Sequence, residues 1–335
     1  MDKVRVGLIG CGGIANYHVS HLIEMPDVQI VAVADLVEER RLAMAQKTGA
    51  TRIYKNHTEL YDAEDAGALD AVYICIEPTA HTDTEERAIE KGWHFLVEKP
   101  MTLDVAKAER IAAAVQAKGL LTHVGFQDRY LDIIEPLRAE LPKHKTGIVY
   151  GAWVGGIPMV WWWLKKSTCG GQLAEQNIHL VDMLRYFFGE PKTVYATCSR
   201  GIVEPFAKDG VQYDTDDHST CVITFDNSVT ATLFSGCYGD YSLTGFDHNG
   251  LTIITHDMTI EYKLRSSTSF ITGKESHTVR TQVDQGMTLD RTFMDAVKSG
   301  DGSAIRSPYG DALKSLKLAL AANESMETGK VVQLG

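Results

Sequence analysis

The chain has 335 residues, of which 44% are hydrophobic and 23% are charged, the balance of an ordinary globular protein with room for two domains. Its formal net charge of −11 disfavours nucleic acid and anionic membranes as partners. Its longest mostly apolar stretch, residues 153–164, is broken by glycine and shorter than the about 20 residues that a membrane-spanning helix needs, so we expect no membrane span.

The first predicted element is an apolar strand that runs into a glycine-rich turn. Residues 4–9 read Val-Arg-Val-Gly-Leu-Ile, and Gly10-x-Gly12-x-x-Ala15 follows at once, where a helix can begin. Gly10 permits a tight turn, Gly12 lets backbone N–H groups approach phosphate oxygens, and Ala15 allows close packing of helix on strand. Because a helix N-terminus also offers unpaired N–H donors, this order predicts a dinucleotide pyrophosphate site.

The second predicted strand, residues 29–34, ends at Asp35, twenty residues past Ala15. An acid at this place accepts hydrogen bonds from an adenosine ribose and repels a 2′-phosphate. Leu36 and Val37 follow, while Arg40 and Arg41 come only later. We therefore predict NAD in preference to NADP. The alternative is a plain glycine turn with an ordinary capping Asp.

Strands and helices alternate through the first 125 residues, as a doubly wound parallel sheet requires. Glycine follows three of the predicted helices as the expected left-handed stop. The further strands are predicted at residues 71–76, 93–97 and 120–124, and the helices at 38–47, 81–91 and 104–118. Residues 1–125 are thus predicted to form an α/β Rossmann domain that binds NAD.

From residue 126 onward the pattern changes to extended segments rich in Thr, Val, Ile and Tyr. Strands are predicted at residues 193–198, 220–225, 228–234, 251–255, 259–264 and 331–334, and late helices at 288–299 and 310–324. This composition indicates an α+β domain, residues 126–335, with an open-faced, largely antiparallel sheet covered by helices on one side. The uncovered face would be a natural surface for a homodimer or homotetramer.

Glu98-Lys99-Pro100 directly follows the predicted strand 93–97. Ligands of doubly wound sheets lie outside the carboxyl ends of the strands, so this tripeptide would reach the cofactor crevice. A lysine there can donate to a substrate hydroxyl and stabilise alkoxide charge. Away from such a strand end, Glu-Lys-Pro would be an ordinary surface loop.

Residues 170–182 hold a second group of polar side chains. If this segment is helical, Glu175, His179 and Asp182 share one face, and Leu173 and Leu180 lie on the other. One interpretation is a general base, His179, oriented by an acid. A second is a plain amphipathic helix whose charged side meets water. A third is zinc bound by Glu175 and His179, for which no further His or Cys is suitably placed.

Trp161, Trp162 and Trp163 stand just upstream of this segment, followed by Lys165 and Lys166. Aromatic faces stack on the C–H surfaces of sugars, so Trp162 and Trp163 are candidates for substrate binding. The alternative is a structural role as core tryptophans.

Taken together, Gly10-x-Gly12-x-x-Ala15, Asp35, Glu98-Lys99-Pro100 and the segment from Glu175 to Asp182 resemble the Gfo/Idh/MocA oxidoreductases over essentially the full chain. The resemblance implies a Rossmann domain followed by an open-faced sheet domain that often mediates dimers or tetramers. It also implies oxidation or reduction of a hydroxyl carbon in sugars, cyclitols or their derivatives.

By position, the resemblance implies that Lys99 and His179 are the catalytic Lys and His and that Glu175 is the acid four residues before the His. Three positions depart from the usual family pattern. Glu175 replaces the common Asp, Asn177 replaces a small residue, and Glu77-Pro78 replaces Thr-Pro.

Most of the residues predicted to contact the cofactor lie in the glycine turn or directly after a Rossmann strand: Gly10, Cys11, Gly12, Gly13, Ile14, Ala15, Asp35, Ile76, Pro78, His81, Glu98, Lys99 and Gln127. Those predicted to contact the substrate are Lys99, Gln127, Arg129, Trp162, Trp163, Glu175 and His179. No metal is predicted.

The leading hypothesis is an NAD-dependent dehydrogenase of a carbohydrate or polyol. His179 removes the hydroxyl proton and Lys99 stabilises the alkoxide-like transition state. One alternative is redox-neutral glycoside cleavage with tightly held NAD. The other is a non-catalytic sensor of NAD or sugar, which would need neither Lys99 nor His179.

The six cysteines are scattered, with no C-x-x-C pair. This distribution favours free thiols in a reducing compartment over a disulfide framework or a zinc site. Since the sequence begins directly with a strand, leaving no room for a signal peptide, we expect a cytoplasmic location.

Overall fold

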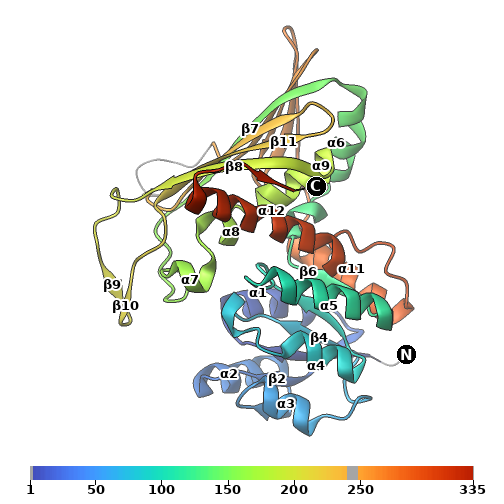
Figure 1. Ribbon diagram of the computed structural model, residues 1–335. Coiled ribbons are helices and arrows are strands. Elements are labelled where there is room, and N and C mark those ends of the chain that lie inside the picture. Colours follow the sequence, from blue (N-terminus) through green and yellow to red (C-terminus); the bar gives the residue numbers. More distant parts are fainter. Residues whose placement is uncertain (1–2, 240–247, 335) are drawn as a thin grey trace. The chain divides into compact units, whose positions relative to one another are not determined.

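The computed structural model describes residues 3–239 and 248–334. The chain forms two compact units, and the first is discontinuous in sequence. It combines Met1–Tyr130 with Val283–Leu313, while the second unit combines Leu131–Gln282 with Lys314–Gly335 (Figure 1). The sequence places a single boundary after residue 125, whereas the contacts bring a late segment back to the first unit.

Among the described residues, a six-stranded parallel sheet forms the centre of the first unit, in the order β3-β2-β1-β4-β5-β6. Apolar strands make such a sheet because both of its faces are buried. The strands are β1 (Val4–Ile9), β2 (Val28–Ala34), β3 (Arg52–Tyr54), β4 (Ala71–Ile74), β5 (His94–Val97) and β6 (Thr122–Val124). This confirms the predicted doubly wound α/β fold.

Helices alternate with these strands, and glycines in the left-handed conformation follow α2, α4 and α5 as predicted. The helices of this unit are α1 (Gly13–Leu22), α2 (Glu38–Thr48), α3 (His57–Ala63), α4 (Thr84–Lys91), α5 (Val105–Lys118) and α11 (Gln285–Ser299), with 3-10 turns η1 (Pro78–Ala80) and η2 (Gln127–Tyr130).

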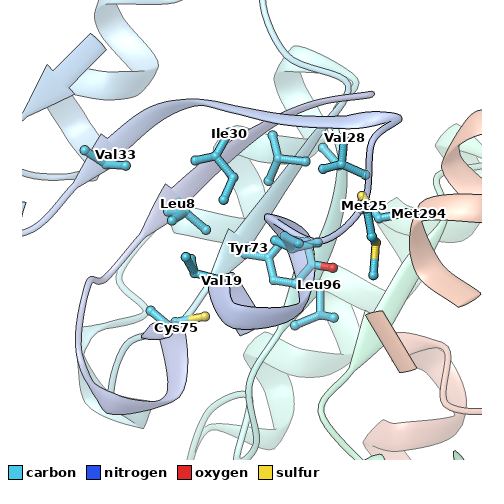
Figure 2. Packing of buried hydrophobic residues seen from close by; sticks show 14 of the residues in the cluster. Leu8, Val19, Met25, Val28, Ile30, Val33, Tyr73, Cys75, Leu96 and Met294 are labelled. Atoms are coloured by element: carbon cyan, nitrogen blue, oxygen red, sulfur yellow. The ribbon is translucent and has the colours of Figure 1, made fainter. Parts of the chain in front are cut away.

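Helix α11 completes the apolar core of the first unit. Its Leu289, Phe293 and Met294 are buried in one cluster with side chains of β1, α1 and β2. Figure 2 shows Met294 beside Met25 and Val28 in this cluster. Because a segment that lies after the second unit's main stretch fills this core, residues 1–130 alone do not complete it.

Within the described part of the second unit, nine strands form a mixed sheet in the order β16-β15-β14-β13-β7-β12-β11-β8-β17. Neighbours pair antiparallel except β7 and β12, which are parallel. The strands are β7 (Thr146–Val154), β8 (Pro191–Ser199), β11 (His218–Phe225), β12 (Thr230–Gly236), β13 (Gly250–Thr255), β14 (Thr259–Lys263), β15 (Ser267–Ile271), β16 (Ser276–Arg280) and β17 (Val332–Gln333). The predicted, largely antiparallel sheet is thereby confirmed.

Helices α8 and α9 contact the central strands β7, β11 and β12 on one side of this sheet. On the other side, alternate residues are exposed, among them Ile148, Tyr150, Tyr195, Phe234 and Ile254. The helical segments here are α6 (Ile134–Glu140), η3 (Leu141–Lys143), α7 (Lys166–Cys169), α8 (Gln172–Glu175), α9 (Ile178–Phe188) and, from Lys314 onward, α12 (Tyr309–Thr328). A small hairpin joins β9 (Ala207–Lys208) to β10 (Val211–Gln212).

Asp132 ties the two ends of the segment 131–282 together. Its Oδ1 accepts a hydrogen bond from Thr281 Oγ1 at 2.6 Å, and its Oδ2 accepts one from the backbone N–H of Gln282 at 3.0 Å. The main stretch of the second unit therefore begins and ends at one place.

Across residues 3–239 and 248–334, none of the helices combines the length and apolarity that crossing a bilayer requires.

Candidate active site

The glycine turn between β1 and α1 has the shape predicted for it. Gly10 has φ +89°, and its N–H donates to the carbonyl of Ala34 at 2.8 Å. Helix α1 begins at Gly13 with Gly12 as its N-cap, which supplies no capping side chain, and no acid lies in its first turn. The space above Gly12 and Gly13 is open, because a Cβ added at either would meet no heavy atom within 4 Å.

This helix start differs from others in the same unit. Asn56 caps α3 and Asp104 caps α5 with side-chain oxygens, and α2 and α4 carry glutamates in their first turns. The open space and uncapped N–H groups at α1 fit a dinucleotide pyrophosphate, whose negative charge would meet the positive end of the helix.

Gly10→Ala is expected to abolish NADH binding. An L-residue at this positive φ costs about 1–2 kcal/mol, and the added Cβ would collide with the backbone carbonyl of Cys75. NADH titration followed by fluorescence measures the loss.

Gly49→Ala at the end of α2 is the matched control, because Gly49 also has a positive φ of 75° but faces open space. This control should lose some stability and retain binding. Unchanged NADH affinity in a folded Gly10→Ala protein would contradict the assigned role of the turn.

Asp35 lies at the end of β2 and holds the glycine turn. Its Oδ2 accepts from the backbone N–H of Cys11 at 2.7 Å, and its Oδ1 accepts from that of Val37 at 2.8 Å. The Arg41 guanidinium bends back to the Asp35 carbonyl at 3.4 Å, so this cation lies nearer to the acid than its sequence position suggests.

The segment after β4 is organised by its own polar side chains. Glu77 caps η1, its Oε2 accepting from the Thr79 N–H at 2.7 Å, and Pro78 is buried. His81 is also buried, with Nδ1 2.5 Å from Glu85 and Nε2 3.2 Å from the Ile76 carbonyl. Both ring nitrogens of His81 thus support the loop, while Ile76 and Glu77 are only half-buried.

Glu98, Lys99 and Pro100 follow β5 directly, as predicted, with a cis peptide bond between Lys99 and Pro100. Glu98 is buried, and its Oε2 accepts a hydrogen bond from the Lys99 backbone N–H at 3.2 Å. The Lys99 side chain is half-buried. The tripeptide therefore places a buried carboxylate next to a half-buried lysine at the carboxyl end of the sheet.

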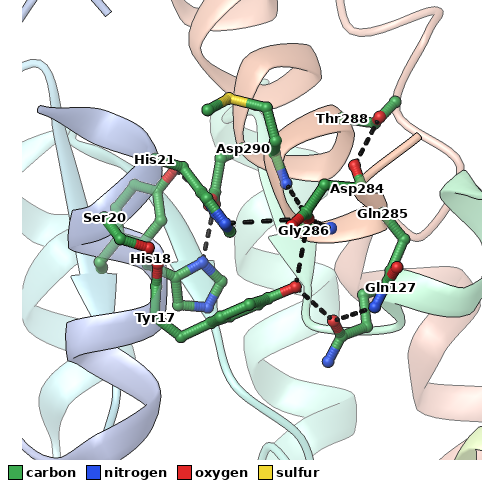
Figure 3. A network of polar contacts seen from close by, with 12 residues as sticks. Tyr17, His18, Ser20, His21, Gln127, Asp284, Gln285, Gly286, Thr288 and Asp290 are labelled. Atoms are coloured by element: carbon green, nitrogen blue, oxygen red, sulfur yellow. Dashed lines mark hydrogen bonds and ion pairs between the residues drawn. The ribbon is translucent and has the colours of Figure 1, made fainter. Parts of the chain in front are cut away.

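Gln127 and Arg129 lie in η2 with different surroundings. The Gln127 Oε1 accepts from the Tyr17 hydroxyl of α1 at 3.2 Å, which keeps Gln127 beside the helix of the glycine turn (Figure 3). Arg129 is only 2% exposed and pairs with Asp311 at 2.7 Å. Its predicted contact with substrate stays a prediction that these contacts do not favour.

In the second unit, the segment predicted as one helix is broken. Helix α8 ends at Glu175 and α9 begins at Ile178, with Asn177 between them donating from Nδ2 to the Phe234 carbonyl of β12 at 2.9 Å. Glu175 and His179 therefore do not lie on one continuous helix.

The interpretation as a water-facing amphipathic helix is wrong, because Glu175, His179 and Asp182 are 2%, 4% and 1% exposed. The His179 ring lies 5.6 Å from the ring of Trp153 on β7. Asp182 accepts from the Ser315 hydroxyl of α12 at 2.6 Å, so it belongs to a structural contact. Glu175 and His179 thus remain the buried polar pair that could do chemistry.

Trp162 and Trp163 are half-buried, with their rings stacked at 5.8 Å. The Trp163 indole N–H donates to Gln172 Oε1 of α8 at 3.3 Å, which connects the aromatic pair to the helix that carries Glu175. Trp161 is 46% exposed.

No three His, Cys, Asp or Glu side chains converge as metal ligands would in the part of the chain that the structure describes. The zinc interpretation of Glu175 and His179 therefore gains no third ligand.

Both parts of the chain match models of one family. Residues 4–126 match the model described as "Oxidoreductase family, NAD-binding Rossmann fold", and residues 147–260 match the "GFO/IDH/MocA C-terminal domain". The chain belongs to the Gfo/Idh/MocA oxidoreductases. This confirms the resemblance seen in the sequence and makes the chain a member of a family of NAD(P)-dependent dehydrogenases that act on CH–OH groups.

Relatives in this Gfo/Idh/MocA family extend along the whole chain. Myo-inositol 2-dehydrogenase of Thermotoga maritima is 24% identical over 343 aligned positions, covering 99% of this chain and 98% of the relative. The scyllo-inositol 2-dehydrogenase (NAD(+)) of Bacillus subtilis is 25% identical, with 99% and 96% covered. A levoglucosan dehydrogenase solved with NADH and levoglucosan has the same fold, with a TM-score of 0.86, 18% identity and coverage of 99% and 100%.

Proposed function

We propose that this chain is an NAD-dependent dehydrogenase that transfers hydride between the nicotinamide and a hydroxyl carbon of a sugar, cyclitol or sugar derivative. The observation that carries the proposal is the pairing, in one unit, of the uncapped α1 N-terminus with Lys99 at the carboxyl end of β5. When bound, NAD supplies the hydride acceptor. The residues of the chain then have to bind, orient and move a proton.

Lys99 is assigned the role of donating from its ammonium to the reacting oxygen, which stabilises the negative charge that develops there. His179 is assigned the role of general base for the hydroxyl proton. Glu175 would orient His179 or accept from a substrate hydroxyl. Burial of Glu175 and His179 supports these roles, since a hydrogen bond made inside a protein is electrostatically stronger than one made in water.

The substrate class rests on two supports. Relatives over the full length are named inositol dehydrogenases, and a solved neighbour of the same fold holds levoglucosan. The stacked Trp162 and Trp163 offer aromatic faces of the kind that contact the C–H surfaces of such rings.

The proposed preference for NAD over NADP gives a direct prediction at Asp35. Asp35→Asn keeps an oxygen for only one of the two N–H groups, those of Cys11 and Val37, and it removes the charge, so the ratio of NADPH to NADH dissociation constants should fall by about tenfold or more. Asp35→Ala should reduce it further and also weaken NADH. Titration of both cofactors against the three proteins measures this.

Equal affinity of the intact protein for NADH and NADPH would contradict this role of Asp35. The nearby Arg41 guanidinium would explain that outcome, because it could neutralise the 2′-phosphate of NADPH.

We further propose a homodimer or homotetramer built through the exposed face of the nine-stranded sheet, where large apolar residues such as Tyr150 and Phe234 are displayed. The six free cysteines suit the reducing cytoplasm.

NADH formation from NAD across inositols, aldoses, glycosides and sugar acids tests the function, with Gly10→Ala as the control without cofactor. A substrate that yields NADH only with the intact protein supports the dehydrogenase. Glycoside cleavage without net NADH would replace it by redox-neutral cleavage. Tight NADH binding with no reaction on any compound would replace it by a sensor.

A further inference from the structure

Behind Glu98 lies a buried polar cluster that the sequence did not reveal. His18 on α1 is 2% exposed, with Nε2 3.0 Å from Glu98 Oε1 and Nδ1 2.7 Å from Asp290 Oδ1 on α11. The other oxygen of Asp290 lies 2.7 Å from Nδ1 of His21, and the Tyr73 hydroxyl of β4 donates to Asp290 at 3.2 Å. Figure 3 shows His18 and His21 turned toward Asp290.

Opposite charges on His18 and its two carboxylate partners stabilise this cluster. Burial alone would lower the pKa of His18, but Asp290 and Glu98 together raise it to about 10. The His18 ring is therefore an imidazolium at neutral pH that donates one N–H to each carboxylate. Burial opposes ionisation of Asp290 as well, yet His18 and His21 hold the pKa of its carboxyl below its usual value.

Two buried neighbours of His18 carry no charge at neutral pH. Tyr73 is neutral because burial raises its pKa well above the usual value, and burial lowers the pKa of His123 on β6 to about 3. Tyr17, on the same helix as His18, makes an edge contact with the His18 ring, with 5.9 Å between the ring centroids.

Glu98 connects His18 to Lys99 through its two carboxylate oxygens. One carboxylate oxygen lies against His18, and the other accepts from the Lys99 backbone N–H. Gly125 packs so closely on this carboxylate that a Cβ there would overlap it. With His18 on one side and Gly125 on the other, the Glu98 side chain has one place to lie.

We propose that His18 is a positioning residue for Lys99: its ring, fixed by Asp290, holds the Glu98 carboxylate, which in turn holds the backbone of Lys99 at the end of β5. The inference rests on the proposed function for the role of Lys99. It links α1, which begins in the glycine turn, to the loop that carries the reacting ammonium.

His18→Gln tests the proposal. Glutamine is neutral, and it lacks the two ring nitrogens with which His18 reaches Asp290 and Glu98. The Glu98 side chain should therefore lose its fixed position. We expect kcat to fall about 10- to 100-fold, as displacement of a reacting group by an ångström does, with little change in NADH affinity.

His21→Gln is the matched control. His21 lies on the same helix and touches the same Asp290, but its described contacts do not include Glu98. A cluster that merely joins α1 to α11 would respond alike to both substitutions, with loss of thermal stability and no selective loss of kcat. That result would overturn the proposal.

A readout without turnover separates this inference from the proposed function. In NMR spectra of the protein without cofactor, the Lys99 backbone amide should shift in His18→Gln and stay in place in His21→Gln. If His18→Gln does not fold, the isosteric Asp290→Asn should shift the same amide. An unmoved Lys99 amide in every folded variant would refute the positioning role, even if the enzyme is active. A moved amide in a protein inactive on every substrate would refute the proposed function alone.

Discussion

Lys99→Ala should lower turnover by about 10²–10⁴-fold while NADH affinity barely changes. The substitution removes the ammonium, but it keeps the backbone N–H that donates to Glu98, so the loop after β5 should hold its shape. The loss should therefore appear in kcat and kcat/KM and not in cofactor binding. Steady-state kinetics on whichever substrate the panel identifies, together with NADH titration, measure both quantities.

Lys118→Ala serves as the comparison, because Lys118 is an exposed lysine at the end of α5. It should behave as the intact protein does. A Lys99→Ala enzyme with ordinary turnover would remove Lys99 from the chemistry and with it the central assignment of the proposed function.

His179→Gln is expected to lower kcat by a similar about 10²–10⁴-fold, since no other group in the proposal accepts the hydroxyl proton. Glutamine roughly matches the length of the side chain, and Trp153 should still pack against it. Circular dichroism and the unfolding temperature show whether the buried site has kept its structure, so that lost activity reports lost chemistry.

The exposed His277 on β16 provides the control, and His277→Gln should have no effect on kcat. If His179→Gln keeps full activity, another residue must act as the base. The role of His179 would then be structural, as part of the packing around Trp153.

The features that the sequence predicted best depend on short-range patterns. The glycine turn, the apolar Rossmann strands and the glycines after α2, α4 and α5 are all specified within a few residues, and the structure contains them. Strand β16 was missed because all of its residues are exposed, so its sequence shows no alternation of apolar and polar residues. Strands β3, β7, β9, β10 and β15 were also missed.

The features that the sequence did not predict depend on distant partners. The break at Asn177 follows from a hydrogen bond to β12, which helical spacing cannot report. Asp290 meets His18 across 272 positions of the chain, so neither residue marks the cluster by its own neighbours. The nearest signal was the pair His18 and His21 at helical spacing on α1, which places both rings on one side of the helix.

The discontinuity of the first unit has a consequence for how the protein is made. On the ribosome, the Rossmann strands emerge first, yet α11, which supplies Phe293 and Asp290 to them, is synthesised only after residue 284. Until then His18 lacks the carboxylate that stabilises its charge, and the apolar face of α1 lacks its cover. The segment 131–282, which belongs to the second unit, is inserted between the two parts of the first unit. Asp132 joins the ends of this segment through Thr281 and Gln282, both of which are synthesised before α11. The part of the enzyme that is translated first is therefore completed late.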